Sequence, residues 1–120
     1  MNKKSNRGSI VLVGWRRPCV EALRKAGYKV SVWAPDPISK KKASLVERNI
    51  HSEFPSDHGE VSRDVYNWAL ASDPVAVIPC TEGSVVPAAL LREKLNLEGV
   101  TVAQAVKCHD KLVMKRAIRG

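Results

Sequence analysis

Three short strand-like segments, separated by stretches of helical periodicity, constrain most strongly how this chain can fold. Residues 10–13 (IVLV) and 75–78 (VAVI) are continuously apolar, and residues 29–33 (KVSVW) alternate polar and apolar side chains. Continuous apolar runs of this length are typical of buried parallel strands, and alternation with period two is the other strand pattern. The sequence therefore predicts an α/β fold, an open and mostly parallel sheet with helices on both faces. We expect the three strands to be adjacent and parallel, with the first one central.

Helices are predicted in the segments that follow each strand. The first covers residues 18–26, because proline is favoured in a first helical turn and Gly27 stands where a C-cap glycine belongs. The second covers residues 61–71, whose apolar side chains recur at i, i+4, i+7 and i+8. The third covers residues 84–95, with Pro87 tolerated in its first turn. This β–α alternation is what a parallel sheet requires.

The remaining segments have weaker patterns. A short strand is predicted around residues 50–54, before a turn at residues 55–59. The three lysines at residues 40–42 predict a solvated loop. Near the C-terminus, residues 101–104 (TVAQ) match a capping box, and Asp110 can begin a final helix whose late turns are basic. We therefore expect two short helices after residue 100.

The composition excludes several classes of protein. No run approaches the roughly 20 apolar residues that span a bilayer, and the N-terminus has no signal-peptide pattern. The three cysteines, Cys19, Cys80 and Cys108, are odd in number and far apart, which fits neither a disulfide framework nor a CxxC metal knuckle. A hydrophobic fraction of 44% is enough for one core. We expect a cytoplasmic domain with reduced thiols and no membrane partner.

The net charge of +8 favours polyanionic partners in general. The basic residues gather in three clusters: the leader before residue 8, residues 40–42, and the last fourteen residues. Because these clusters are dispersed along the chain, they argue against one dedicated nucleic-acid stripe. Nucleic acid is therefore not the partner that we expect.

The turn after the first strand contains the first candidate binding residues. It reads Gly14-Trp15-Arg16-Arg17-Pro18, which is neither GxGxxG nor a P-loop, so a dinucleotide site is disfavoured. Arg16 and Arg17 nevertheless follow the carboxyl end of a strand, where open α/β sheets bind their ligands. Two interpretations stay open: contacts with an anionic substrate, or a solvated arginine pair above a helix N-terminus.

Glu82 is the second candidate, because it follows the strand at residues 75–78 and precedes a helix. A carboxylate there can bind a substrate amine, or it can cap the helix, and position alone does not choose between them. His51, His58 and His109 have neither HxH nor HExxH spacing, and no Cys–His pair recurs at ligand intervals. The sequence predicts no catalytic residue and no metal site.

The order of these features resembles the domain that precedes the ATP-binding lobes of ATP-grasp ligases, the superfamily of biotin carboxylase, D-alanine ligase and amino-acid ligases. The strand at residues 75–78 is followed by residues 81–83 (TEG), an alanine-rich helix at residues 85–90 and the turn LNLEG at residues 95–99. Residues 109–116 (HDKLVMKR) resemble the helix that leads into the ATP-grasp domain. The resemblance covers nearly the whole chain except the basic leader.

This resemblance implies a Rossmann-like pre-ATP-grasp domain at residues 10–107, after a flexible leader at residues 1–9. Residues 108–120 would be a helix leading into an ATP-grasp domain after Gly120. The implied enzyme is an ATP-dependent carboxylate–amine ligase, which uses ATP and magnesium to convert a carboxylate into an acyl phosphate that an amine attacks. The implied partners are that ATP-grasp domain and a small carboxylate substrate.

The resemblance also assigns individual residues. Lys111 matches the lysine that contacts nucleotide phosphate, and Glu82 matches the region that faces substrate. Arg16 and Arg17 are substrate-binding candidates from their place at the carboxyl end of the first strand, independently of the resemblance. The glycine-rich flap, the other ATP ligands and the magnesium-binding acidic residues would follow Gly120. An ATP site needs several phosphate and metal contacts at once, so we expect no cofactor and no ligase activity for the 120-residue chain alone.

Two further expectations concern partners. A rival hypothesis from another class is a stand-alone Rossmann-like module that binds an anionic ligand or nucleic acid through Arg16 and Arg17. The final helix carries apolar residues around much of its circumference: Leu112, Val113, Ala117 and Ile118. A helix this short is marginal without packing, so we expect it to fray or to pack against a second copy in a dimer.

Overall fold

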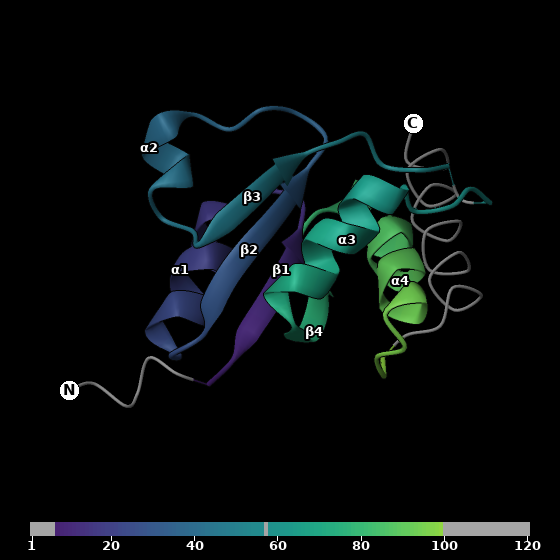
Figure 1. Ribbon diagram of the computed structural model, residues 1–120. Coiled ribbons are helices and arrows are strands. Elements are labelled where there is room, and N and C mark those ends of the chain that lie inside the picture. The colour runs from purple at the N-terminus through teal and green to yellow at the C-terminus, as the bar shows by residue number, and fades with distance from the viewer. Residues whose placement is uncertain (1–6, 57, 100–120) are drawn as a thin grey trace, which may run out of the picture.

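The computed structural model describes residues 7–56 and 58–99 of the chain. Strands and helices alternate along this part of the sequence (Figure 1). In chain order they are β1 (Ser9–Val13), α1 (Arg17–Lys25), β2 (Lys29–Ala34), α2 (Lys40–Ala43), β3 (Arg48–His51), α3 (Arg63–Ser72), β4 (Pro74–Pro79), the 3-10 helix η2 (Glu82–Ser84) and α4 (Val85–Lys94). The β–α alternation predicted from the sequence is confirmed.

The strands form one four-stranded sheet in the order β3-β2-β1-β4. Every neighbouring pair is parallel, and Ile10 of β1 lies opposite Val30 of β2 and Ala76 of β4. The prediction that the first strand lies between the other two predicted strands is therefore confirmed. Neighbouring strands are parallel because each helix returns the chain to the same end of the sheet.

Helices cover both faces of the sheet, and the alternation of side chains along β1 separates two apolar cores. Val11 and Val13 face the core formed with α3 and α4, whereas Leu12 faces the core formed with α1. All three side chains are fully buried, which contributes roughly 1.5–3 kcal/mol for each. The continuous apolar run at residues 10–13 is explained by this two-sided burial.

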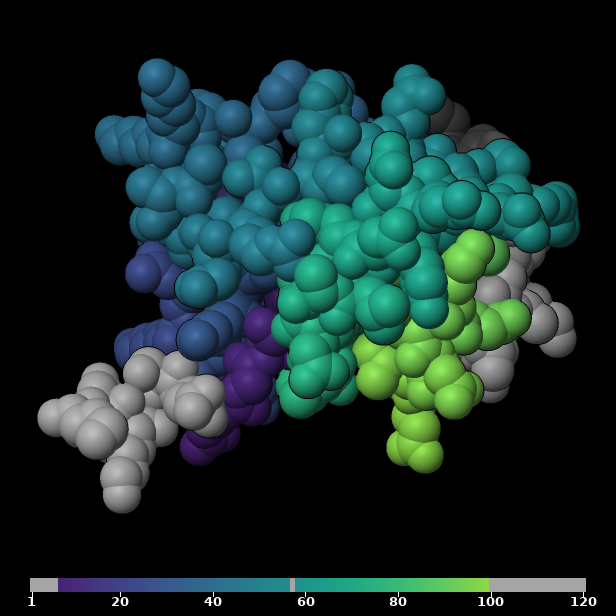
Figure 2. Space-filling model, viewed as in Figure 1, coloured from purple at the N-terminus to yellow at the C-terminus, as the bar shows by residue number. Residues whose placement is uncertain are grey.

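The covering elements are visible from outside the molecule. In Figure 2, α3 and the segment around β3 cover the sheet, and β1 (purple) is visible only near its N-terminal end. Ser62 begins α3, since its side-chain oxygen accepts a hydrogen bond of 3.2 Å from the Val65 N–H. Asp73 ends α3 in the left-handed conformation, with φ of 47°. These caps place α3 within two residues of its predicted position.

Two predictions about the middle of the chain were wrong in detail. Residues 40–42 form the first turn of α2 instead of a loop, because the Ser39 hydroxyl accepts a hydrogen bond from the Lys42 N–H at 3.2 Å. The strand expected at residues 50–54 lies at Arg48–His51. Beyond the end of this strand, the Phe54 ring packs edge-on against the Trp33 ring, with centroids 5.1 Å apart.

The two helices expected after residue 100 lie outside the described residues, as does most of the basic leader. At the start of the described chain, the Arg7 N–H donates to the Gly27 carbonyl at 3.1 Å, two residues before β1 begins. Among the helices of residues 7–56 and 58–99, none has the length and apolar character that crossing a bilayer requires.

Candidate functional site

The carboxyl ends of β1 and β4 lie side by side, so the loops that follow these strands meet. The Cys80 N–H donates to the Val13 carbonyl at 3.1 Å, which extends the pairing just past the end of β4. The next residue on each side makes the closest approach, because the Thr81 side chain packs against Gly14. Gly14 has a φ of 91°, which only glycine adopts readily. This contact joins the loop that carries Arg16 to the turn that carries Glu82.

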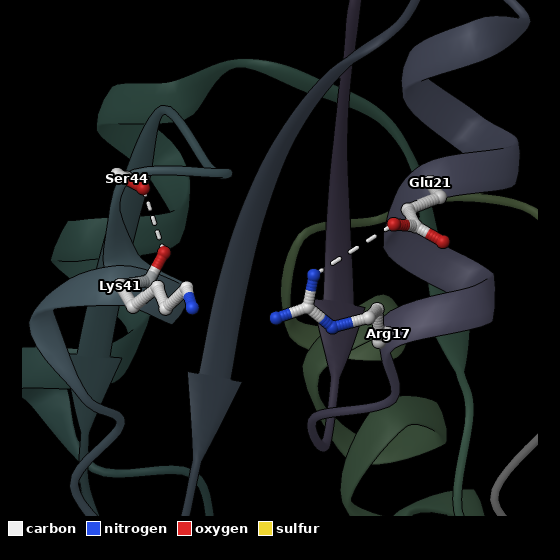
Figure 3. Close-up of polar contacts among 4 residues, drawn as sticks. All are labelled: Arg17, Glu21, Lys41 and Ser44. Atoms are coloured by element: carbon white, nitrogen blue, oxygen red, sulfur yellow. Dashed lines mark hydrogen bonds and ion pairs between the residues drawn. The ribbon is translucent and has the colours of Figure 1, made fainter.

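Arg16 and Arg17 begin α1 at this edge. Arg16 occupies the N-cap position, with an extended backbone, and its side chain makes no capping hydrogen bond. Its guanidinium is exposed to solvent. Arg17 faces Glu21 one turn along the helix, with 3.8 Å between its Nη1 and the carboxylate (Figure 3). Since Arg17 already has a carboxylate neighbour, Arg16 is the more available of the two cations for an anionic ligand.

Lysines from α2 approach the same edge. The Lys42 ammonium lies 5.6 Å from the centre of the Trp15 ring, in the range of a cation–π contact. In Figure 3 the Lys41 ammonium and the Arg17 guanidinium point toward one another. At the C-terminal end of α2, the Ser44 hydroxyl donates a hydrogen bond to the Lys41 carbonyl at 2.6 Å. The start of α1 and α2 thus bring positive charge to one edge of the sheet, although Arg17 and Lys42 are 25 positions apart in the sequence.

Glu82 lies in the first turn of η2, immediately after the Gly14 contact, and is exposed. The hydrogen bonds that cap this turn come from its neighbours: the Ser84 hydroxyl accepts from the Thr81 N–H at 3.0 Å and donates to the Thr81 carbonyl at 2.7 Å. Thr81 and Ser84 thus form the capping box of η2. The structure places Glu82 at the same edge as Arg16.

A pair of thiols lies below the arginines. Burial above all, together with the neighbouring Cys19 side chain, raises the pKa of Cys80 to about 12, while Arg16 acts in the opposite direction. Cys80 also lies 3.5 Å from the Val13 carbonyl. The Cys80 thiol is therefore protonated at neutral pH.

Several of these residues were not predicted as a group from the sequence. Gly14 was recognised as the end of a strand, but its contact with Thr81 was not, and Lys42 was interpreted as part of a solvated loop. Cys19 and Cys80 were interpreted as isolated thiols. No local pattern could have paired them, because each pair joins positions that only the parallel sheet brings together.

The described residues do not fit a nucleotide or metal site by themselves. Within residues 7–56 and 58–99, no group of three or more histidine, cysteine, aspartate or glutamate side chains could hold a metal ion. The β1–α1 turn has a single glycine, Gly14, where a phosphate-cradling loop needs several. Lys111, assigned to nucleotide phosphate by resemblance, lies outside the described residues.

A separate hollow of about 540 Å³ lies at the opposite end of β2. It is lined in part by Arg24, Lys25 and Lys29. Arg24 and Lys25 stand in the last turn of α1, where basic side chains are stabilised by the helix dipole. Because these charges have this explanation, and ligands of open α/β sheets bind at the carboxyl edge, we assign the candidate site to that edge.

Comparison with known proteins supports the fold. No protein-family model matches the chain, and no curated protein is similar enough in sequence to count as a match. An L-amino acid ligase from Bacillus licheniformis has a similar structure, with a TM-score of 0.64 and 18% identity over 85% of this chain and 27% of the ligase. N5-carboxyaminoimidazole synthetase from Staphylococcus aureus, complexed with ADP, has a TM-score of 0.54 and 18% identity over 78% of this chain and 24% of the synthetase.

The chain thus spans about a quarter of the length of each of these enzymes. At this level of identity the likeness concerns the fold. It confirms the Rossmann-like α/β fold that the sequence resemblance implied.

Proposed function

We propose that this chain is the N-terminal domain of an ATP-dependent carboxylate–amine ligase and contributes one wall of its substrate site. The observation that carries the proposal is the contact of Thr81 with Gly14, which joins the Arg16 loop to the Glu82 turn at the carboxyl edge of the sheet. The likeness to an L-amino acid ligase and to a carboxyaminoimidazole synthetase supports this choice of enzyme class.

The charges at this edge suit a substrate with both a carboxylate and an amine. Arg16 is exposed at the start of α1 and can donate two parallel hydrogen bonds to a carboxylate. Glu82 is exposed in the neighbouring turn and can accept hydrogen bonds from an ammonium group. Arg17 and Lys41 add positive charge that attracts an anion to the edge. The substrate class is therefore a small carboxylate, with an amino acid as the first choice.

Activation of the carboxylate belongs to another part of the full enzyme. In the proposed reaction ATP would transfer its terminal phosphoryl group to the carboxylate and leave as ADP, and the amine would then displace phosphate to form the amide, with magnesium balancing the charge of the phosphates. The residues described here hold the substrate against that centre, and none of them is assigned to the chemical step. We propose that Lys111 contacts the nucleotide phosphate and that an ATP-grasp domain follows Gly120.

The test compares the chain with the protein obtained when translation continues past Gly120. We expect the longer protein to release phosphate from ATP when supplied with members of a panel of amino acids and other carboxylates. R16Q and E82Q should raise the KM for the carboxylate substrate at least tenfold, because each removes a charge-assisted contact. R24Q, on the far end of α1, is the matched control and should leave KM unchanged. Equal KM values for R16Q and R24Q would contradict the site assignment.

The rival function is a binding module for nucleic acid, which the basic residues of this edge favour. A salt titration separates the two, because binding through several phosphates weakens steeply as salt rises. We expect no measurable binding of single- or double-stranded oligonucleotides at low salt. Tight binding with a steep salt dependence, together with no ATP-dependent activity of the longer protein, would favour the rival.

A further inference from the structure

Cys19 and Cys80 lie on the same face of the sheet although 61 positions separate them in the sequence. Side chains alternate along β4, so Val77 faces the core of α3 and α4, and Ile78 and Cys80 face the α1 side. Cys19, in the first turn of α1, packs against this second core as well. The parallel pairing of β4 with β1 thus brings Cys80 beneath the start of α1.

Both thiols pack against the same apolar core, which contains Leu12 and Val20. The backbone holds them there, because the Cys80 N–H donates to the Val13 carbonyl at 3.1 Å and the Cys19 N–H donates to the Arg16 carbonyl at 3.1 Å. The Cys80 thiol donates to the Val13 carbonyl at 3.5 Å, and the Cys19 side chain is among the causes that raise the pKa of Cys80. Both side chains are half-buried, so they remain within reach of a small reagent.

We propose that Cys19 and Cys80 form a reversible disulfide by exchange with a small-molecule disulfide of the glutathione class. This bond would link the first turn of α1 to the end of β4, between the loops that carry Arg16 and Glu82. Such a link restrains the candidate binding edge. The proposal does not depend on the ligase function, since it concerns only the thiols and their oxidant.

The order of the two exchange steps follows from the surroundings of the thiols. Cys80 stays protonated because burial raises its pKa to about 12, so the Cys19 thiolate makes the first attack. Its sulfur bonds to one sulfur of the small disulfide and the other leaves as a thiolate. Cys80 then loses its proton to solvent and attacks the Cys19 sulfur, which releases the second small thiolate. In sum, two protein thiols are oxidised and one small disulfide is reduced to two thiols.

Arg16 favours both steps. It lowers the pKa of Cys80 and so opposes the effect of burial. Once Cys19 carries a mixed disulfide, it no longer contributes to the raised pKa of Cys80. The carboxylates of glutathione disulfide are also attracted to the exposed cations Arg16 and Arg17. Exchange at this pair should therefore be faster than at a thiol without cationic neighbours.

The experiment treats the full 120-residue chain with glutathione disulfide at pH 8 and maps the disulfides by mass spectrometry of unreduced peptides. We expect one dominant cross-linked peptide pair, Cys19 with Cys80, formed with loss of two hydrogen atoms and reversed by dithiothreitol. The C108S variant should give the same pair, and the oxidised protein should unfold several degrees higher than the reduced protein.

The single variants test the order of attack. C80S should stop at a mixed disulfide with glutathione on Cys19, whereas C19S should leave Cys80 largely unmodified over the same time. Absence of the Cys19–Cys80 pair in the wild-type chain would overturn the proposal, as would pairs with Cys108 formed just as readily. Faster modification of Cys80 in C19S than of Cys19 in C80S would overturn the proposed order.

Discussion

The side chain of Thr81 lies directly against Gly14, so that a Cβ atom at position 14 would come within 2.7 Å of Thr81 Oγ1 and 3.0 Å of its methyl carbon. This contact fixes the distance between the two loops of the candidate site. It depends on a glycine with φ of 91°, at the one place where β1 turns into the loop before α1.

Replacement of Gly14 by alanine should therefore lower the free energy of unfolding by roughly 2–4 kcal/mol, because left-handed strain and a steric clash add. Urea denaturation of the purified chain measures this change. The matched control is G83A, because nothing lies within 4 Å of a Cβ built on Gly83, which is exposed in η2. G83A should change stability by less than about 0.5 kcal/mol. Equal effects of the two substitutions would contradict the packing described here.

The two tryptophans Trp33 and Trp68 should respond differently to the same substitution. Trp33 is fully buried, and its Nε1–H donates to the Ser52 carbonyl at 2.9 Å. In the described part of the chain, the buried Nε1 of Trp68 has no hydrogen-bond partner. W33F should therefore destabilise the protein by about 2–3 kcal/mol, because it removes the hydrogen bond to Ser52 and part of the buried side-chain volume. W68F should destabilise it by less than about 1 kcal/mol, because it removes no hydrogen bond. Chemical denaturation that ranks W68F as the more damaging variant would refute this argument.

Arg92 is the one arginine in the described residues that is buried, with 8% of its surface exposed. Its guanidinium donates to the Val77 carbonyl of β4, and burial lowers its pKa. R92M keeps most of the apolar stem but leaves that carbonyl without this donor, so stability should fall by about 1.5–3 kcal/mol. R24M, on the exposed surface of α1, should cost under about 1 kcal/mol. Thermal unfolding of both variants would show whether Arg92 has this structural role.

Cys80 should make the protein less stable at high pH. Its pKa is raised from 9.0 to about 12 in the folded chain, so the folded state holds a proton that the unfolded state has lost. The contribution of this raised pKa to the free energy of unfolding is fully present below pH 9 and is lost as the pH rises from 9 toward 12. The wild-type chain should therefore lose more stability across this range than C80S. Urea denaturation at each pH gives the free energy of unfolding of the two proteins. If this free energy falls equally with pH in both, the Cys80 thiol is not buried.

The 120-residue chain alone should neither hydrolyse ATP nor ligate substrates. Its described residues contain no set of side chains that could hold magnesium, and its β1–α1 turn has one glycine. The assay is ADP release in the presence of ATP, magnesium and a panel of carboxylates and amines, against a blank without protein. Substrate-stimulated ADP release above that blank would show that the chain does more than the proposed domain.

Much of the fold could be predicted because its causes are local in sequence. The run at residues 10–13 is apolar on both sides because β1 is covered on both faces, and Pro18 and Gly27 mark the ends of α1. A proline or glycine at a helix end acts within one helical turn, and an apolar run acts within one strand. Both features can therefore be recognised from the adjacent residues in the sequence. The placement of Arg16 and Glu82 at one sheet edge followed from the same β–α order. Whether they bind substrate stays a prediction.

The contacts that define the site were decided by tertiary structure alone. Three pairs of distant residues are brought together because β1 pairs with β4 on one side and with β2 on the other. They are Gly14 with Thr81, Cys19 with Cys80, and Trp15 with Lys42. The sequence also misplaced β3: the predicted strand at residues 50–54 included Phe54, whose ring packs against the buried Trp33 ring after β3 has ended. Local patterns specify which segments are strands and helices, since those depend on backbone geometry and burial of one face. Which side chains touch depends on strand order and register, and these are set by packing across the whole sheet.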